Sequence, residues 1–290
     1  MSILRFSGFN SNDFKEQCLS SNTALFENGA KNWPAIEKWD LNYFEKTCPN
    51  IPVVTKVFSD SKIDVKNMSM GEYVKIIKEF KRKEGNDTDK VAPYCHDVPI
   101  FLLAKELLED IGDFPKDVMP DWYAQDWSRF AQFFVSAKNS VTPLHFDTLL
   151  THNLFFQIKG KKIFTIIRPE HEHLCYRKKW RWFSVDPENP DYDKYPNFKN
   201  VKVDKVEVNS GDIFYMPPGT IHHVRSLEDS ISFNVDFHTF DSVLKSFFSA
   251  FKGMPKENHY YNYQSLKALL FKPNNDVLFN KYKSYLNYIS

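Results

Sequence analysis

The chain has 290 residues, of which 42% are hydrophobic and 16% aromatic, enough to fill a sizeable core. Its 38 basic and 37 acidic residues nearly cancel, which argues against binding to nucleic acid or an anionic membrane through bulk charge. No run approaches the roughly 18 apolar residues that a membrane span needs. Widely spaced cysteines predict free thiols rather than a disulfide frame, so we expect a soluble, cytoplasmic protein.

In chain order, the first two regions differ in pattern. Residues 1–125 mix strand-like runs such as IPVVTKVF (51–58) with helical runs such as MGEYVKIIKEFKR (70–82). Residues 126–240 contain many short β-branched and aromatic runs separated by turn residues, among them RFAQFFVSA, THNLFFQI, KKIFTIIR and SISFNVDFH. Short strands at this spacing favour an antiparallel sheet that is closed into a barrel or folded into a sandwich.

Two further segments accompany these strands. Residues 173–198 form a connection rich in Pro, Asp and Tyr, and connections of this length are usually functional or disordered. The segment carries a basic and aromatic cluster, which either stacks on a polar ligand or seals the barrel end as a solvated loop: Tyr176, Arg177, Lys178, Lys179, Trp180, Arg181 and Trp182. Residues 241–290 return to helical periodicity, and their apolar faces need a partner, either the barrel or a second chain.

A candidate metal site begins with His145 and Asp147 in TPLHFD. On a strand, side chains two residues apart point to the same face and can converge on one ion. Downstream, GDIFYMPPGTIHHV delivers His222 and His223 after a Pro-Pro-Gly turn, and this pair offers a third ligand. Two imidazoles and a carboxylate on one side of a metal form the facial arrangement of non-haem iron oxygenases. A His-x-Asp triplet alone is weak evidence, because a half-buried polar strand explains it equally well.

The last strand-like run, SISFNVDFH, alternates polar and apolar side chains. Ser232, Asn234 and Asp236 are polar, whereas their neighbours Phe233 and Val235 are apolar. A surface strand explains this alternation about as well as the wall of a wet active site does. Its position just after the histidine pair favours the wall.

The stretches SVTPLHFD, NLFFQIKGKK, PDYDKYPNF, SGDIFYMPPGTIHHV and SISFNVDF follow the order found in JmjC-like cupin oxygenases. The chain resembles that family over most of residues 20–240, in particular its bacterial cupin-like group and the asparaginyl hydroxylase of the hypoxia-inducible factor. This resemblance implies a mainly β fold with flanking helices, a double-stranded β-helix (jelly roll) of the cupin/JmjC type. The barrel is expected at 126–240 with 173–198 as an insertion, residues 1–125 as a mixed α/β part that packs on it, and 241–290 as a helical extension.

The resemblance also assigns metal ligands. His145 and Asp147 match the first two iron ligands, and the second histidine of the pair, His223, matches the third. His222 is then the neighbour that does not bind the metal.

The same comparison assigns a co-substrate site. Lys162 matches the basic residue that binds the distal carboxylate of 2-oxoglutarate, and Thr142 and Tyr94 match hydroxyl donors to that carboxylate. Asn153 matches a polar residue that lines this site, with Thr151 and His152 as alternatives because HFDTLLTHN is two residues longer than expected. Asp236 stands where the asparaginyl hydroxylase has an asparagine, and it either binds a basic substrate, alters nearby pKa values or serves as a structural group.

The activity implied is that of an Fe(II)- and 2-oxoglutarate-dependent dioxygenase, which uses O2 to hydroxylate a C–H bond and releases succinate and CO2. We expect the substrate to be a side chain of a peptide or protein. The alternative is a hydroxylase or demethylase that acts on a small molecule or an RNA nucleoside. Two other functions are possible on this fold. One is a metal-dependent cupin that does not use 2-oxoglutarate, which would not need Lys162, Thr142 and Tyr94. The other is a non-catalytic binding module. The resemblance further predicts a homodimer formed through the helices of 241–290.

Overall fold

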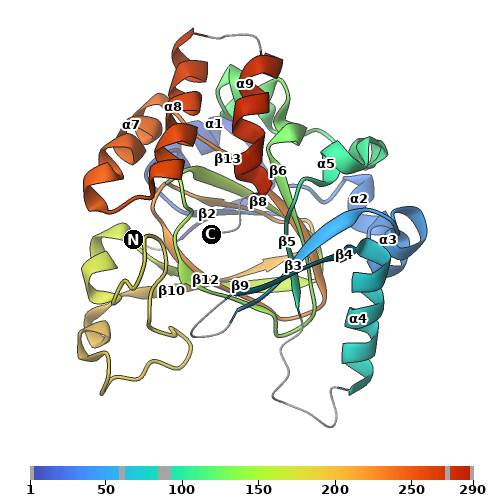
Figure 1. The fold of residues 1–290 in the computed structure, drawn as a ribbon, viewed down its shortest axis with the longest axis horizontal. Coiled ribbons are helices and arrows are strands. Elements are labelled where there is room, and N and C mark those ends of the chain that lie inside the picture. Colours follow the sequence, from blue (N-terminus) through green and yellow to red (C-terminus); the bar gives the residue numbers. More distant parts are fainter. Residues whose placement is uncertain (1–2, 59–62, 84–92, 272–274, 288–290) are drawn as a thin grey trace.

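The computed structural model describes residues 3–58, 63–83, 93–271 and 275–287, and its strands form two facing sheets (Figure 1). The larger sheet has the order β1 (Leu4–Ser7), β2 (Ala24–Glu27), β11 (Ile213–Met216), β8 (His152–Lys159), β13 (Ser230–Phe237), β6 (Ala131–Ser136), β5 (Tyr94–Val98), β3 (Pro52–Phe58) and β4 (Ile63–Ser69). The smaller sheet has the order β10 (Val203–Asn209), β9 (Lys161–Ile167), β12 (Ile221–Ser226) and β7 (Val141–His145).

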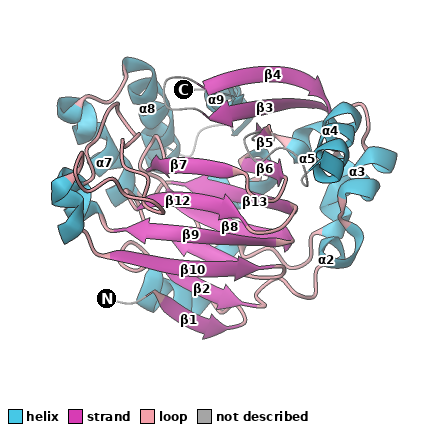
Figure 2. Cartoon of the chain, turned by 90° about the horizontal axis from the view of Figure 1, so that it is seen from below, coloured by secondary structure: helices cyan, strands magenta, loops and turns pink. Residues whose placement is uncertain are grey.

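The chain crosses from one sheet to the other at almost every connection between β6 and β13. Strands β6, β8, β11 and β13 lie in the larger sheet, and β7, β9, β10 and β12 lie in the smaller one (Figure 2). Neighbouring strands in this part are antiparallel. This winding is a double-stranded β-helix, so the fold predicted from the sequence is confirmed.

Helices cover the outer face and the ends of the sheets (Figures 1 and 2). The α-helices are α1 (Ser11–Asp13), α2 (Pro34–Lys38), α3 (Leu41–Thr47), α4 (Met70–Lys83), α5 (Ile100–Leu103), α6 (Asp121–Ala124), α7 (Phe240–Phe248), α8 (Lys256–Phe271) and α9 (Asn275–Tyr282). Shorter 3-10 and π turns are η1 (Phe14–Cys18), η2 (Lys105–Asp110), η3 (Lys116–Val118), η4 (Trp127–Arg129), η5 (Pro169–Leu174), η6 (Pro196–Asn200), η7 (Ser249–Lys252) and η8 (Lys283–Asn287). Within the described part of the chain, no helix has both the length and the apolar character needed to cross a membrane.

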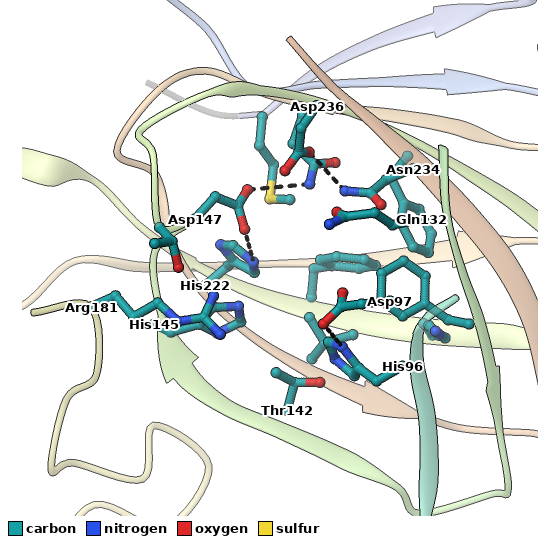
Figure 3. Close-up of a pocket in the computed structure, with 18 of the residues that line it drawn as sticks. His96, Asp97, Gln132, Thr142, His145, Asp147, Arg181, His222, Asn234 and Asp236 are labelled. Carbon is teal, nitrogen blue, oxygen red and sulfur yellow. Dashed lines mark hydrogen bonds and ion pairs between the residues drawn. The ribbon is translucent and has the colours of Figure 1, made fainter. Parts of the chain in front are cut away.

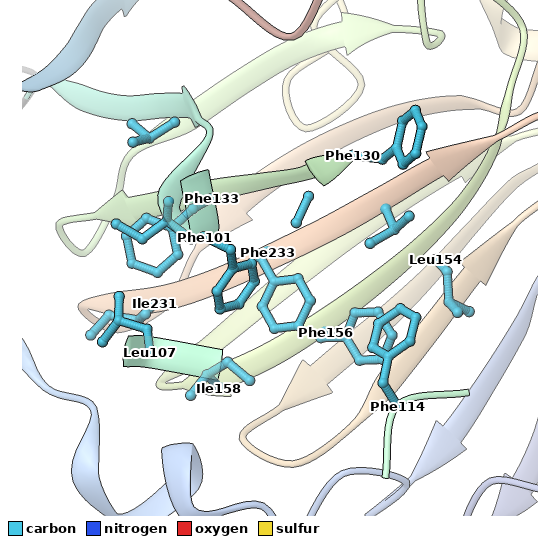
Figure 4. Packing of buried hydrophobic residues seen from close by; sticks show 14 of the residues in the cluster. Phe101, Leu107, Phe114, Phe130, Phe133, Leu154, Phe156, Ile158, Ile231 and Phe233 are labelled. Atoms are coloured by element: carbon cyan, nitrogen blue, oxygen red, sulfur yellow. The ribbon is translucent and has the colours of Figure 1, made fainter. Parts of the chain in front are cut away.

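The two faces of the larger sheet differ in polarity. Apolar side chains on its outer face, such as Phe133, Phe156 and Phe233, are fully buried and pack against the N-terminal helices and turns, as Figure 4 shows. The ring of Phe233 lies 4.8 Å from Phe156 and 5.5 Å from Phe101 of α5. Because side chains alternate along a strand, the intervening positions point between the sheets, and these carry the polar residues of the pocket described below.

A glycine turn carries the chain from the larger sheet to the smaller one. Gly160 connects β8 to β9 with φ +72°, a conformation that L side chains rarely adopt. A Cβ at this position would lie 2.1 Å from the carbonyl oxygen of Asp229. The turn therefore requires glycine, and it leads directly into β9, whose second residue, Lys162, lies opposite Ser226 of β12.

The C-terminal helices pack on the barrel of their own chain. In α9, Phe279 lies 5.5 Å from Phe130 and Tyr282 lies 5.4 Å from Trp122, ring centre to ring centre. The capping box of Thr239 and Ser242 starts α7 directly after β13. The buried side chains of these helices therefore pack on their own chain, as one of the two predicted alternatives required.

Candidate functional site

His145 and Asp147 lie where β7 ends, on the inner side of the smaller sheet (Figure 3). The Nδ1 atom of His145 lies 2.7 Å from the carbonyl oxygen of Pro143, and a carbonyl can only accept, so Nδ1 carries the proton. The lone pair is then on Nε2. Burial, with the charges of His222 and Arg181, holds the pKa of His145 well below its usual value, which keeps the ring neutral as a metal ligand must be.

His222 of β12 completes a group of three. It lies opposite His145 in the strand register, and the two ring centres are 4.2 Å apart. Its Nδ1 atom lies 3.0 Å from the carbonyl oxygen of Thr220, so Nδ1 carries the proton and the lone pair is again on Nε2. This Nε2 atom lies 3.8 Å from Oδ1 of Asp147. One donor atom from each residue falls within 4.8 Å of the others, close enough to share one metal ion.

The choice of His223 from the histidine pair was wrong. Adjacent residues of a strand point to opposite faces, and since His222 faces His145, the His223 side chain faces away from the pocket. Its Nε2 atom lies 3.8 Å from Oε2 of Glu188 in the insertion. The structure therefore places His222, not His223, with His145 and Asp147.

Asp186, Glu188 and His223 form a second group with metal-binding side chains, outside the pocket. The Arg225 guanidinium already donates to both carboxylate oxygens of Glu188, at 2.9 Å and 2.8 Å from Nε. Any cation at this place would compete with Arg225. We interpret the group as an anchor that ties the insertion to β12.

Lys162 lies fully inside the pocket without an acidic partner. Its ammonium donates to the Tyr94 hydroxyl at 2.7 Å and to the Ser232 hydroxyl at 3.0 Å, and its side chain is 1% exposed. The rings of Tyr94, Phe155 and Phe134 surround it at 5.1 to 5.7 Å. No carboxylate forms an ion pair with it among the described residues, and burial lowers its pKa to about 7. Thr142 lines the same pocket.

Two amides in the pocket donate to two carboxyl groups, those of the candidate ligand Asp147 and of Asp236. Asn153 donates to Oδ2 of Asp147 at 3.2 Å, and Asn234 donates to Oδ1 of Asp236 at 2.7 Å. Burial raises the pKa of Asp236 well above its usual value, and the nearby charge of Asp147 adds to this. His152, an alternative to Asn153 in the sequence alignment, contacts Tyr215 and Thr239 instead and does not line the pocket.

The structure adds pocket residues that the sequence analysis did not single out for this site. The pocket measures about 750 Å³, counted to its open mouth, and its walls also include His96, Asp97, Gln132, Thr148, Arg181 and Tyr285. Figure 3 shows Asp97 beside His96, and Lys56 donates to this carboxylate at 2.6 Å. Strand alternation in AQFFVS, with Gln132 and Phe134 on one face, could have identified β6 as a wall. Nothing in the sequence pattern indicated Tyr285.

The insertion lies directly beside the candidate ligands. Trp182 forms a β-bridge with His145, and their rings are 5.0 Å apart. The Trp180 indole donates to the carbonyl oxygen of Thr148 at 2.9 Å, and the Arg181 guanidinium lies 4.5 Å over the Trp182 ring. The aromatic residues of the cluster therefore seal this side of the barrel, whereas Arg181 reaches the pocket.

The chain matches the Cupin-like domain family over residues 11–242. Among similar curated proteins are JmjC domain-containing protein D of Dictyostelium discoideum, 28% identical over 244 residues, which cover 76% of this chain and 53% of the relative. Lysine-specific demethylase 8 of Xenopus tropicalis is 23% identical over 226 residues, covering 73% of this chain and 47% of the relative. The human bifunctional peptidase and (3S)-lysyl hydroxylase JMJD7 is 20% identical over 276 residues, covering 84% and 85%.

The chain spans about half the length of most of these relatives. The family match nevertheless covers the whole barrel, including each of the three grouped residues His145, Asp147 and His222. The family named from the sequence motifs is confirmed: the chain belongs to the cupin-like domain family and is of the JmjC type.

Proposed function

We propose that the protein is an Fe(II)- and 2-oxoglutarate-dependent dioxygenase that hydroxylates a C–H bond. The observation that carries this proposal is Lys162, a buried cation without an anionic partner among the described residues, in the same pocket as the group His145, Asp147 and His222. A buried ammonium is costly unless an anion meets it. A dianionic co-substrate bound in this pocket would supply that anion, with Lys162 as the residue that holds it.

The residues present fit an iron(II) ion. Two neutral imidazoles and one carboxylate suit this metal and leave positions open on its other side. When bound, iron, 2-oxoglutarate and O2 supply the oxidation, in which R–H becomes R–OH while 2-oxoglutarate becomes succinate and CO2. The chain orients the two imidazoles through the Pro143 and Thr220 carbonyls, and Asn153 orients the carboxylate of Asp147.

For the co-substrate, Lys162 and the Thr142 hydroxyl bind the distal carboxylate, and Tyr94 holds the ammonium in place. Aromatic walls around Lys162 exclude water from this end and strengthen the ion pair. These groups supply a dianion site that a cupin without 2-oxoglutarate does not need.

As substrate we propose the side chain of a basic residue in a peptide or protein. Asp236 is buried in the pocket of the candidate metal ligands, where no described residue forms a salt bridge with it, although the charge of Arg181 favours its ionised form. A cationic substrate would stabilise its charged form. Names of similar proteins point the same way, since they include an arginine-specific demethylase of Arabidopsis thaliana as well as the lysine-directed enzymes above. A small molecule or RNA nucleoside remains the alternative substrate.

The test is anaerobic addition of 2-oxoglutarate to iron(II)-loaded protein, followed by exposure to air. We expect a visible absorption band on binding and slow formation of succinate afterwards, even without substrate. Protein that binds iron but gives neither band nor succinate would be a metal-dependent cupin of another kind. Protein that binds no metal would be a binding module.

We also propose that the chain forms a homodimer through its C-terminal helices. Several aromatic side chains there stay exposed after the helices have packed on the barrel, including Phe248, Phe251 and Phe271. Exposed apolar groups of this size are typical of an interface between chains. The free, buried cysteines at Cys18, Cys48, Cys95 and Cys175 suit a reducing compartment, and we propose the cytoplasm.

A further inference from the structure

One wall of the pocket comes from outside the barrel. Among the described residues that line the pocket, Tyr285 alone lies beyond residue 242, where the family match ends. It belongs to η8, the turn that follows α9. The other lining residues lie between 94 and 236, on strands, on the loop after β7 and on the insertion.

Neighbouring aromatic residues hold Tyr285 in place. Its ring lies 5.5 Å from Tyr261 of α8 and 5.5 Å from Tyr282 of α9, and the Tyr261 and Ser284 hydroxyls are 3.0 Å apart. Tyr285 is 7% exposed, although it is close to the end of the described chain. Figure 1 shows α9 running toward the rim of the ring of strands, and η8 packs against β5. The tail therefore crosses an end of the barrel.

Tyr285 lines the same pocket as the candidate ligands His145, Asp147 and His222. Burial raises its pKa well above the usual value, and the carboxylates of Asp236, Asp147 and Asp97 raise it further. Lys162, in contrast, contacts Tyr94, Ser232 and aromatic rings, and Tyr285 is not among these contacts. A change at position 285 can thus alter the shape of the pocket without removing a candidate metal ligand or Lys162.

We propose that Tyr285 is a specificity-determining residue: as a wall of the pocket that holds His145, Asp147 and His222, its ring limits the bulk of what reaches them. This inference rests on the proposed function. Backbone hydrogen bonds join the strands within each sheet, so a substrate cannot pass through either sheet, and Tyr285 supplies one wall of the pocket between them. Tyr285 lies outside the residues that match the family, whereas His145, Asp147 and His222 lie inside them. The size limit set by Tyr285 can therefore be particular to this chain.

The test uses Mn(II)-loaded protein, which binds co-substrate analogues without turnover. Two probes are compared by stopped-flow and calorimetry: N-oxalylglycine, and its derivative with a benzyl group on the carbon between nitrogen and carboxylate. In Tyr285→Ala we expect the association rate of the bulky probe relative to the small one to rise about tenfold, since removing a clash in a pocket changes discrimination by that order. Tyr285→Trp should lower the same ratio.

Tyr263→Ala is the matched control, because Tyr263 is 49% exposed on α8 and does not line the pocket. It should leave both rates unchanged, and N-oxalylglycine affinity should be unaltered in all three variants. If the ratio of the two association rates is unaltered in both Tyr285→Ala and Tyr285→Trp, the inference is wrong. It is also wrong if both probes lose affinity equally, because Tyr285 would then only support the pocket structurally. If Tyr285→Ala does not fold, Tyr285→Trp alone decides. Wild-type protein that binds Mn(II) but not N-oxalylglycine would instead refute the proposed function, and this inference with it.

Discussion

Replacing Lys162 by Met is the most direct test of the co-substrate site. Methionine fills a similar volume among the rings of Tyr94, Phe134 and Phe155, so the change removes the charge while the wall stays packed. Loss of a charge-assisted contact costs about 1.5 to 3 kcal/mol, which raises the KM for 2-oxoglutarate about ten- to a hundredfold. Iron binding should be unchanged.

The neighbouring lysine provides the control. Lys161 points to the other face of β9, where it pairs with Glu207 at 3.5 Å and is 35% exposed. Lys161→Met should leave the KM for 2-oxoglutarate at the wild-type value in a succinate assay. If Lys162→Met also leaves it there, the anchor lies elsewhere. Arg168, the next candidate on this stretch, pairs with Glu170 at 3.6 Å and does not line the pocket.

The same site predicts a pH dependence. With a pKa of about 7 before binding, Lys162 is charged below that pH and neutral above it. Because the dianion binds the charged form, binding above pH 7 must take up a proton, and affinity falls by up to about tenfold per pH unit. Affinity should therefore be level below about pH 7 and decline above it, whereas Lys162→Met shows no such break. A wild-type affinity that rises above pH 7 would contradict this sign.

Four further predictions follow from the other contacts. His222→Ala should lower iron affinity about a hundredfold or more, whereas His223→Ala should keep the metal. Iron content after dialysis measures both. The reverse result would make His223 the third ligand, as first predicted from the sequence. Gly160→Ala should lower the free energy of unfolding by about 1 to 3 kcal/mol in urea titration, because its Cβ meets the Asp229 backbone, and a neutral effect would refute the strain argument. Arg181→Ala should weaken turnover of substrate and spare uncoupled succinate formation; equal loss of both would assign Arg181 to the co-substrate pocket. Phe251→Glu should halve the mass per particle in light scattering if the C-terminal helices form the dimer, since this side chain is 91% exposed, and an unchanged mass would exclude that surface.

The barrel could be predicted from sequence because its signals are local. Alternation in SISFNVDFH gave the polar face of β13, and Asn234 and Asp236 do line the pocket. The spacing of His145 and Asp147 gave two of three grouped residues for the same reason. The choice between His222 and His223 could not be made locally, because the phase of β12 depends on its register with β7.

Contacts between segments that are far apart in the chain could not be predicted from the sequence. The apolar periodicity of residues 241–290 showed that the helices needed a partner, but the same periodicity fits the barrel or a second chain. Tyr285 reaches the pocket only because α8 and α9 fold back on the sheet. The division into regions 1–125, 126–240 and 241–290 stays a prediction.

The bridge between Trp182 and His145 has a consequence for the solubility of the protein. β7 is the last strand of the smaller sheet, and the insertion pairs with its free side: the Phe146 amide donates to the Arg181 carbonyl at 3.2 Å and the Phe183 amide to the Leu144 carbonyl at 3.0 Å. Without these bonds, an open edge next to His145 would be available to strands of other molecules. A shortened insertion would therefore promote aggregation as well as loosen the backbone that carries His145.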